Sequence, residues 1–199
     1  MSTQSDAKAA RRTQILEAAL GVFAERGYHG TRVEDIAAAA GVSKGTIYLY
    51  FESRDAILRA AFDRFIEEVD GAVEQAMGSD RPPLDKLRAL VRRVLERMEA
   101  QETLSRVLVD FWAAGLHDRS QPTIDFKPIY ARWRRQLTAL LEEAAARGDL
   151  APDVPEHAAT MTIALVEGLQ LQWLADPDAV PLADAGKRTI DAMIDGLAP

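Results

Sequence analysis

Apolar residues recur along the chain every three or four positions, which is the period of one face of an α-helix. Residues 13–26 carry one such stripe, and Gly27 follows where a helix can end. A longer stripe begins at Arg54, behind the capping residue Ser53. Beyond residue 70 no segment has the alternating pattern of a strand, so the sequence predicts an all-α protein of about nine helices.

Proline and glycine mark the ends of the later helices. A break at residues 78–83 separates the fourth helix from a fifth, whose apolar stripe includes Leu87, Leu90 and Leu95. Four more helices are expected at residues 103–117, at about 122–147 with a stop at Gly148, at 156–175, and at about 182–197.

Residues 31–51 contain two short predicted helices joined by a tight turn. Thr31 and Glu34 have the spacing of a capping box, which predicts that the first of these helices begins at Thr31. Gly41 supplies the helix stop, because a residue without Cβ enters the left-handed conformation cheaply. Ser43 then caps the second helix. A turn of about three to four residues that contains glycine is typical of a helix-turn-helix motif, whose second helix lies in the major groove of DNA.

The second helix, residues 44–51, has one side for packing and another that is unlike a solvated surface. Advancing 100° per residue brings Ile47 and Phe51 together, on the side that packs against the first helix. The opposite side carries small or apolar residues, namely Gly45, Thr46 and Leu49. Such a surface suits close approach to DNA and contact with a thymine methyl. Groups that can reach phosphates lie at the flanks and the start of the helix, namely Tyr48, Tyr50, Ser43 and Lys44.

The segment from residue 15 to residue 58 resembles the N-terminal DNA-binding domain of the TetR (tetracycline-repressor-like) transcriptional regulators. Many spaced positions agree at once, namely Gly27-Tyr28, Thr31, Asp35-Ile36-Ala37, Gly41-Val42-Ser43, Thr46-Ile47-Tyr48 and Tyr50-Phe51. The resemblance implies a three-helix DNA-binding domain at residues 9–53, followed by a helical ligand-binding and dimerisation domain at residues 54–199. It also implies a homodimeric repressor that releases its operator when a small molecule binds.

Two positions depart from the pattern of the family. Arg32 stands where a small hydroxyl residue is more usual, and Glu34 stands where some relatives carry arginine. We interpret Arg32 as a further phosphate contact, whereas the capping box explains Glu34. With Arg54 carried over as a phosphate contact, the expected DNA-binding residues are Arg32, Ser43, Lys44, Gly45, Thr46, Tyr48, Leu49, Tyr50 and Arg54.

The last two predicted helices carry apolar residues on more than one stripe, as Leu165, Leu169 and Leu171 illustrate. Such breadth requires two neighbours, one within the subunit and one outside it. In relatives the last two helices form a four-helix dimer interface, and we expect a homodimer here; a monomer with two central helices is the alternative. A two-fold dimer places its recognition helices about 34 Å apart, so the expected partner is double-stranded DNA with an inverted repeat.

Aromatic residues gather in the sixth and seventh predicted helices, and large side chains of neighbouring helices can face them. Aromatic residues more often serve packing, but helix-bundle interiors are also common sites for small apolar molecules. The residues expected to bind an effector are Met98, Phe111, Trp112, Tyr130, Trp133, Met161, Gln170 and Trp173. The mixture of large rings with His117, Glu167 and Gln170 suits a mostly hydrophobic compound with one polar handle.

Net charge excludes one class of DNA-binding protein. The chain has 24 Lys and Arg residues against 31 Asp and Glu residues, a formal net charge of −7. A protein that coats nucleic acid nonspecifically would be basic. The first 60 residues carry eight basic and seven acidic side chains, so the acidic excess lies in the remainder of the chain. This asymmetry favours one orientation of the protein towards DNA.

Other classes of protein are not favoured. The sequence has no cysteine and three scattered histidines, and it lacks a phosphate-binding glycine loop and a Gly-x-Ser-x-Gly motif, so we expect no enzyme activity, metal site or cofactor. No apolar run approaches the roughly 18 residues of a membrane span, and no secretion signal is visible, so we expect a cytoplasmic protein. The predicted function is ligand-responsive regulation of transcription, most simply repression. A transcriptional activator of the same fold and a helical protein–protein adaptor are the alternatives.

Overall fold

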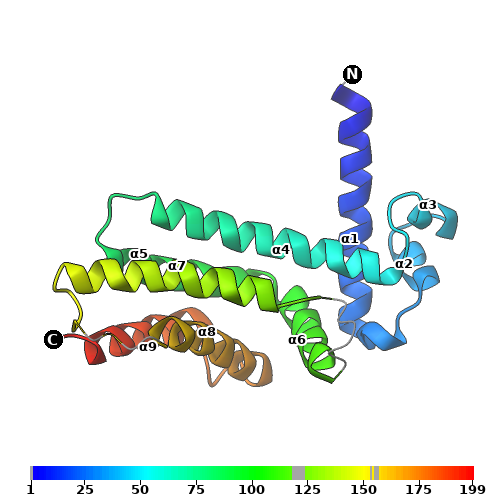
Figure 1. Cartoon of the computed structure of the whole chain (residues 1–199). Helices are drawn as coiled ribbons and strands as arrows, with labels where there is room; N and C mark the ends of the chain where they lie inside the picture. The colour runs from blue at the N-terminus through cyan, green and yellow to red at the C-terminus, as the bar shows by residue number, and fades with distance from the viewer. Residues whose placement is uncertain (1, 118–123, 153, 155–156) are drawn as a thin grey trace. The chain divides into compact units, whose positions relative to one another are not determined.

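The computed structural model describes residues 2–117, 124–152, 154 and 157–199, with the backbone alone at residues 2–5, 111 and 113–117. Over these residues the chain forms nine α-helices and no strand, which confirms the predicted all-α fold (Figure 1). In chain order the helices are α1 Ser2–Gly30, α2 Val33–Ala39, α3 Lys44–Tyr48, α4 Arg54–Met77, α5 Pro83–Ala100, α6 Glu102–His117, α7 Lys127–Ala146, α8 Ala158–Ala175 and α9 Leu182–Gly196.

The helices form two compact units, and the division falls within α4. Unit 1 comprises residues 1–67 and 103–124, and unit 2 comprises residues 68–102 and 125–199. The sequence pattern did not indicate that α6 groups with the N-terminal helices. The functional domains expected at residues 9–53 and 54–199 stay a prediction.

In unit 1, α1 packs against α2, and α2 packs against α3. The predicted apolar stripe of α1 is buried, and it includes Ile15, Leu16, Ala19 and Phe23. Gly27 has a φ of +69° and interrupts the helical backbone where the sequence predicts a stop. The beginning of α1 differs from the prediction, because the helix starts at Ser2 rather than near residue 13.

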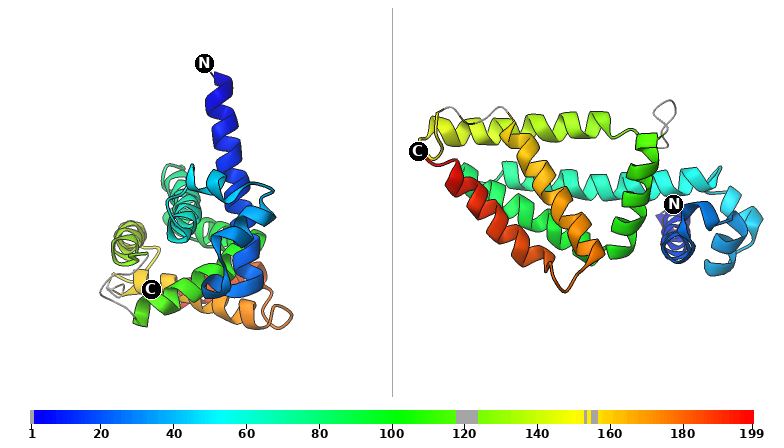
Figure 2. Two further views of the ribbon diagram at one scale, coloured as in Figure 1. Left: turned by 90° about the vertical axis from the view of Figure 1, so that its right-hand side faces the viewer. Right: turned by 90° about the horizontal axis from the view of Figure 1, so that it is seen from below.

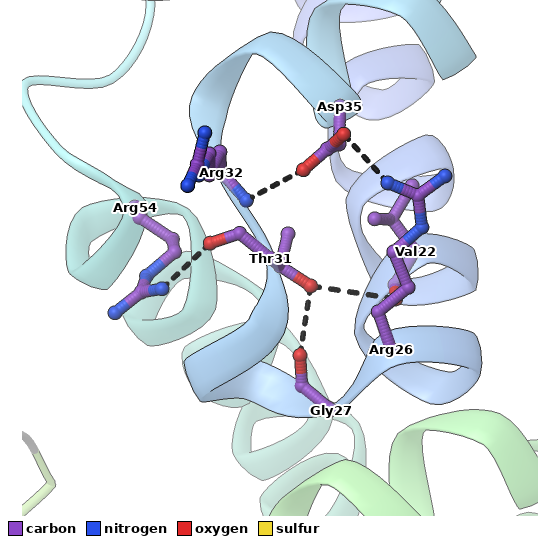
Figure 3. Close-up of polar contacts among 7 residues, drawn as sticks. All are labelled: Val22, Arg26, Gly27, Thr31, Arg32, Asp35 and Arg54. Atoms are coloured by element: carbon purple, nitrogen blue, oxygen red, sulfur yellow. Dashed lines mark hydrogen bonds and ion pairs between the residues drawn. The ribbon is translucent and has the colours of Figure 1, made fainter.

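The expected capping box of Thr31 and Glu34 is wrong. The N-cap of α2 is Arg32, and the carboxylate of Asp35 accepts a hydrogen bond from the Arg32 backbone N–H at 2.9 Å (Figure 3). Thr31 is buried, and its hydroxyl donates to the carbonyl of Gly27 at 2.8 Å. Helix α2 therefore begins one residue later than predicted, with Arg32 as its N-cap. The Thr31 hydroxyl, which a capping box would direct towards the start of α2, is instead hydrogen-bonded to the end of α1.

Arg54, the first residue of α4, fastens this helix to the turn between α1 and α2. Its Nη1 atom donates to the carbonyl of Thr31 at 2.6 Å, as Figure 3 shows, and to that of Tyr28 at 2.9 Å. The guanidinium lies 3.9 Å from the centroid of the Tyr28 ring, and the Tyr28 hydroxyl donates to Asp55. Because hydrogen bonds from a charged donor are stronger than neutral ones, they hold the start of α4 beside the start of α2.

In unit 2, α5 packs against α7 and α9, and α8 packs against α7 and α9 (Figure 2). Pro83 opens α5 as predicted, and Gly148, with a φ of +79°, follows α7 as predicted. At Gly186 in α9 there is no room for a Cβ, because it would overlap the side chain of Leu95 in α5. The starts expected for α7 and α8 at residues 122 and 156 lie outside the described residues, but residues 124–126 are described and not helical, so α7 begins later than predicted, at Lys127.

Thr31→Val preserves the shape of the side chain but removes the hydroxyl that bonds to Gly27. Because the Gly27 carbonyl loses this partner in a part-buried position, we expect the free energy of unfolding to fall by about 1–3 kcal/mol. Urea denaturation followed by circular dichroism measures the change. The control, Thr103→Val, alters an exposed threonine of α6 and is expected to stay within about 0.5 kcal/mol of the parent. Equal losses in both variants would contradict this role of Thr31.

Candidate nucleic-acid interface and effector site

The recognition helix of the predicted motif is α3, and local interactions define both of its ends. Gly41 has a φ of +64° and turns the chain out of α2. The Ser43 hydroxyl oxygen accepts from the backbone N–H of Thr46 at 3.1 Å, which confirms the predicted cap. The helix ends at Tyr48, earlier than the predicted end at Phe51. Such a short helix depends on its surroundings for stability.

Residues 44–51, which are α3 and the turn after it, have the two sides that the sequence predicts. Ile47 and Phe51 are buried, at 1% and 4% exposure. Leu49 is 78% exposed and Tyr48 is 48% exposed. The helix that the motif assigns to the major groove therefore carries an apolar outer surface.

Gly45 lies within α3, although the fold does not require glycine there. A Cβ at this position would meet only the Ser43 Oγ atom within 4 Å, at 3.7 Å, which is an ordinary contact. Glycine inside a helix is less stable than alanine by about 0.5–1 kcal/mol. Packing within the described residues therefore does not explain why glycine stands at this position.

Lys44, a predicted DNA contact, forms an ion pair with Glu34. The Lys44 Nζ atom donates to the carboxylate at 2.5 Å and lies 5.9 Å from the centroid of the Tyr48 ring. This hydrogen bond holds the pKa of Glu34 below its usual value and raises the pKa of Lys44. Sequence reasoning missed the pair because it placed Glu34 in a capping box, and the partners are ten positions apart.

Three further predicted DNA contacts differ in how accessible they are. Arg32 is exposed, and Tyr50 is half-buried. The Nη1 atom of Arg54 is bonded to the carbonyls of Tyr28 and Thr31, so a phosphate contact would use the other guanidinium nitrogens. A DNA contact of each of these residues stays a prediction.

Aromatic and charged side chains of α4, α7 and α8 meet in unit 2. The Tyr130 hydroxyl donates to the carboxylate of Glu167. The Tyr130 and Trp133 rings meet edge to face, with their centroids 5.9 Å apart. The Trp133 Nε1 atom lies 3.5 Å from the carboxylate of Asp70, with which Arg132 forms an ion pair at 2.7 Å. The structure thus joins two aromatic residues of the expected effector site to two carboxylates, Tyr130 to Glu167 and Trp133 to Asp70.

Glu167 is partly buried among these groups. Its removal from water raises the pKa of the carboxyl group above the usual value, and the hydrogen bond from Tyr130 opposes this only in part. An ionised carboxyl in such a position costs stability. Groups of this kind gather at functional sites, which makes Glu167 a candidate for binding the polar end of a ligand.

The other residues of the expected effector site lie in different surroundings. Three of them are buried, namely Met98, Gln170 and Trp173. Met161 is exposed on α8. Phe111 and Trp112 belong to α6 in unit 1, and the side chain of Phe111 lies outside the described residues.

Two further kinds of site are absent from the described part of the chain. None of its helices combines the length and apolar character that crossing a membrane requires. Within the same residues, no group of three or more histidine, cysteine, aspartate or glutamate side chains is arranged to hold a metal ion.

Known proteins are similar to both parts of the chain. A family model described as bacterial regulatory proteins of the tetR family matches residues 15–61. A second family model, described as the C-terminal part of BetI-type transcriptional repressors, matches residues 82–199. Together the two matches include the helix-turn-helix motif and most of unit 2.

Individual relatives are similar over most of the chain. The HTH-type transcriptional regulator TtgR of Pseudomonas putida is 31% identical over 197 residues, covering 94% of this chain and 90% of TtgR. The HTH-type transcriptional regulator RutR of Escherichia coli is 34% identical over 157 residues, covering 77% of this chain and 71% of RutR. The solved structure of the fatty acid degradation regulator FadR from Bacillus halodurans has a TM-score of 0.75 at 26% identity, covering 93% of this chain and 98% of that chain. The chain therefore belongs to the tetR family of bacterial regulatory proteins and is a DNA-binding regulator of transcription.

Proposed function

We propose that this regulator is a repressor that binds an inverted-repeat operator as a homodimer and releases it when a small, largely hydrophobic effector binds. The proposal assigns DNA binding to residues 9–53, and effector binding and dimerisation to residues 54–199. The observation that carries it is the division of residues 44–51, which are α3 and the turn after it, into a buried side with Ile47 and Phe51 and an exposed side with Tyr48 and Leu49. The C-terminal match to BetI-type repressors supports repression rather than activation.

The exposed side of α3 has the chemistry of a surface that reads the major groove. Leu49 offers an apolar contact for a thymine methyl, and Gly45 allows the helix backbone to approach the bases closely. Tyr48 and Arg32 are exposed and can donate hydrogen bonds to phosphates beside the groove. These groups support the DNA contacts predicted from the sequence.

Exposed apolar residues of α8 support the proposed subunit interface. Met161 and Leu171 are 42% and 43% exposed. Because α8 is apolar around most of its circumference, its packing against α7 and α9 leaves apolar surface uncovered. A second copy of the chain would cover this surface through α8 and α9 of both subunits. The resulting two-fold symmetry matches an inverted repeat.

The aromatic group of unit 2 supports the proposed effector site. Tyr130 and Trp133 supply apolar ring surface, and Glu167 supplies one polar group beside them. Ligand sites in helical bundles combine mostly apolar walls with a few polar groups that orient the ligand. The partial burial of Glu167 strengthens any interaction that its carboxyl makes with a ligand.

Selection of bound sequences from random duplex DNA tests the proposed function. We expect an inverted repeat, with affinity that falls steeply as salt increases because phosphate contacts release counterions. Tyr48→Ala is expected to weaken binding to the selected operator by about 1–3 kcal/mol. Arg134→Ala, an exposed change in α7, is the control and should leave the affinity unchanged. A helical adaptor would select no sequence and would be indifferent to Tyr48→Ala.

A reciprocal pair of variants tests the proposed dimer. Met161→Glu combined with Leu171→Glu places charges in the expected interface, so analytical ultracentrifugation should detect a monomer. Leu49→Glu puts the same charge on the exposed leucine that follows α3, and this variant should stay dimeric while losing operator binding. A dimer that survives the double change would show that the interface lies elsewhere.

Glu167→Gln tests the partly buried carboxyl. Because burial raises its pKa in the folded state, the ionised carboxyl lowers stability above that pKa, and this cost disappears below the ordinary value of 4.5. We therefore expect the variant to melt at a higher temperature than the parent at pH 7, and the difference to vanish as the pH falls below 4.5. Glu143→Gln, at an exposed position of α7, should melt like the parent at both pH values. An unchanged melting temperature for Glu167→Gln at pH 7 would argue against the carboxyl's cost to stability.

A further inference from the structure

The ion pair of Glu34 and Lys44 joins the starts of the two helices of the motif. Glu34 is the second residue of α2, and Lys44 is the first residue of α3. The carboxylate of the neighbouring Asp35 caps α2 and links it to α1, since it accepts from the Arg32 N–H and pairs with Arg26 at 2.6 Å. The Glu34 carboxylate instead accepts from Lys44 at the start of the recognition helix and from its own backbone N–H.

Stability does not account for this pair. The two side chains are 58% and 52% exposed, and ion pairs between such exposed groups contribute only about 0–1 kcal/mol. Phosphates repel a carboxylate on a DNA-facing surface, and pairing with Glu34 keeps Lys44 from neutralising a phosphate. For binding to the DNA backbone alone, the pair is therefore unfavourable. An advantage for DNA binding has to come from the bases.

The major-groove edge of a G·C base pair has the complementary pattern of hydrogen-bonding groups. Guanine presents two acceptors, N7 and O6, and cytosine presents its N4 amino donor beside O6. A lysine ammonium donates to the guanine acceptors, and a glutamate carboxylate accepts from cytosine N4. In an A·T pair the N6 donor lies between the acceptors N7 and O4, which repel a carboxylate on both sides.

We propose that the Glu34–Lys44 pair reads one G·C base pair in each operator half-site, with Glu34 accepting from cytosine N4 and Lys44 donating to guanine. This inference rests on the proposed function, in which α3 enters the major groove. The donor and the acceptor are already adjacent in the free protein, with Nζ and the carboxylate 2.5 Å apart. Such preorganisation reduces the conformational freedom lost on binding. Glu34 is thus a specificity-determining residue of the regulator.

The test is the base preference of the protein at each operator position. Selection from random duplex DNA should give the wild-type protein a required G·C pair at one position of each half-site. Replacement of that pair by A·T in both half-sites should weaken binding roughly tenfold or more. Glu34→Ala should lose this preference and keep those at other positions. Glu34→Gln should keep it in part, because the amide oxygen still accepts a hydrogen bond.

Glu25→Ala is the matched control. It removes an exposed glutamate from α1 and changes the net charge equally, so its base preferences should equal those of the parent. If Glu34→Ala tightens binding to all sequences alike and leaves every preference intact, the carboxylate is merely repulsive and the inference is overturned. If the wild-type protein selects no inverted repeat, the proposed function fails first, which distinguishes the two failures. Thermal melts of both Glu34 variants verify that they are folded.

Discussion

A recognition helix of five residues is not stable alone, so DNA reading by this chain depends on how α3 is held. Burial of Ile47 and Phe51 fixes one side of the segment, and the Ser43 cap satisfies its first turn. The two buried residues are four positions apart, so the segment cannot rotate without moving an apolar side chain into water. The outward direction of Leu49 follows from this constraint and not from any contact of its own.

The helical period is sufficient to predict the two sides of α3, because only neighbours within one turn are involved. The start of α2 is different. Thr31 with Glu34 and Arg32 with Asp35 are overlapping pairs of equal spacing, and local rules favour the first pair, because threonine is a preferred capping residue and arginine is not. The choice is made by tertiary structure, since Thr31 is buried against the end of α1 and its carbonyl accepts from Arg54.

The polar pairs at the two candidate sites were beyond the reach of sequence patterns for a related reason. Lys44 and Glu34 are ten positions apart, and Tyr130 and Glu167 are 37 positions apart, so each pair exists only once separate helices have packed. The sequence did identify Tyr130 and Trp133 as candidates, because aromatic residues were concentrated there. It also named Glu167 near them, but it could not show that the Tyr130 hydroxyl donates to Glu167 or that Trp133 lies beside Asp70, since these contacts join separate helices.

Gly45 separates the requirements of folding from those of function. Its surroundings have room for a methyl group, and an alanine there would favour the helix by about 0.5–1 kcal/mol. Selection for heat resistance alone would therefore tend to replace this glycine. Selection for operator recognition would retain it, so the residue found at this position in a thermostable descendant would reveal which of the two pressures had acted.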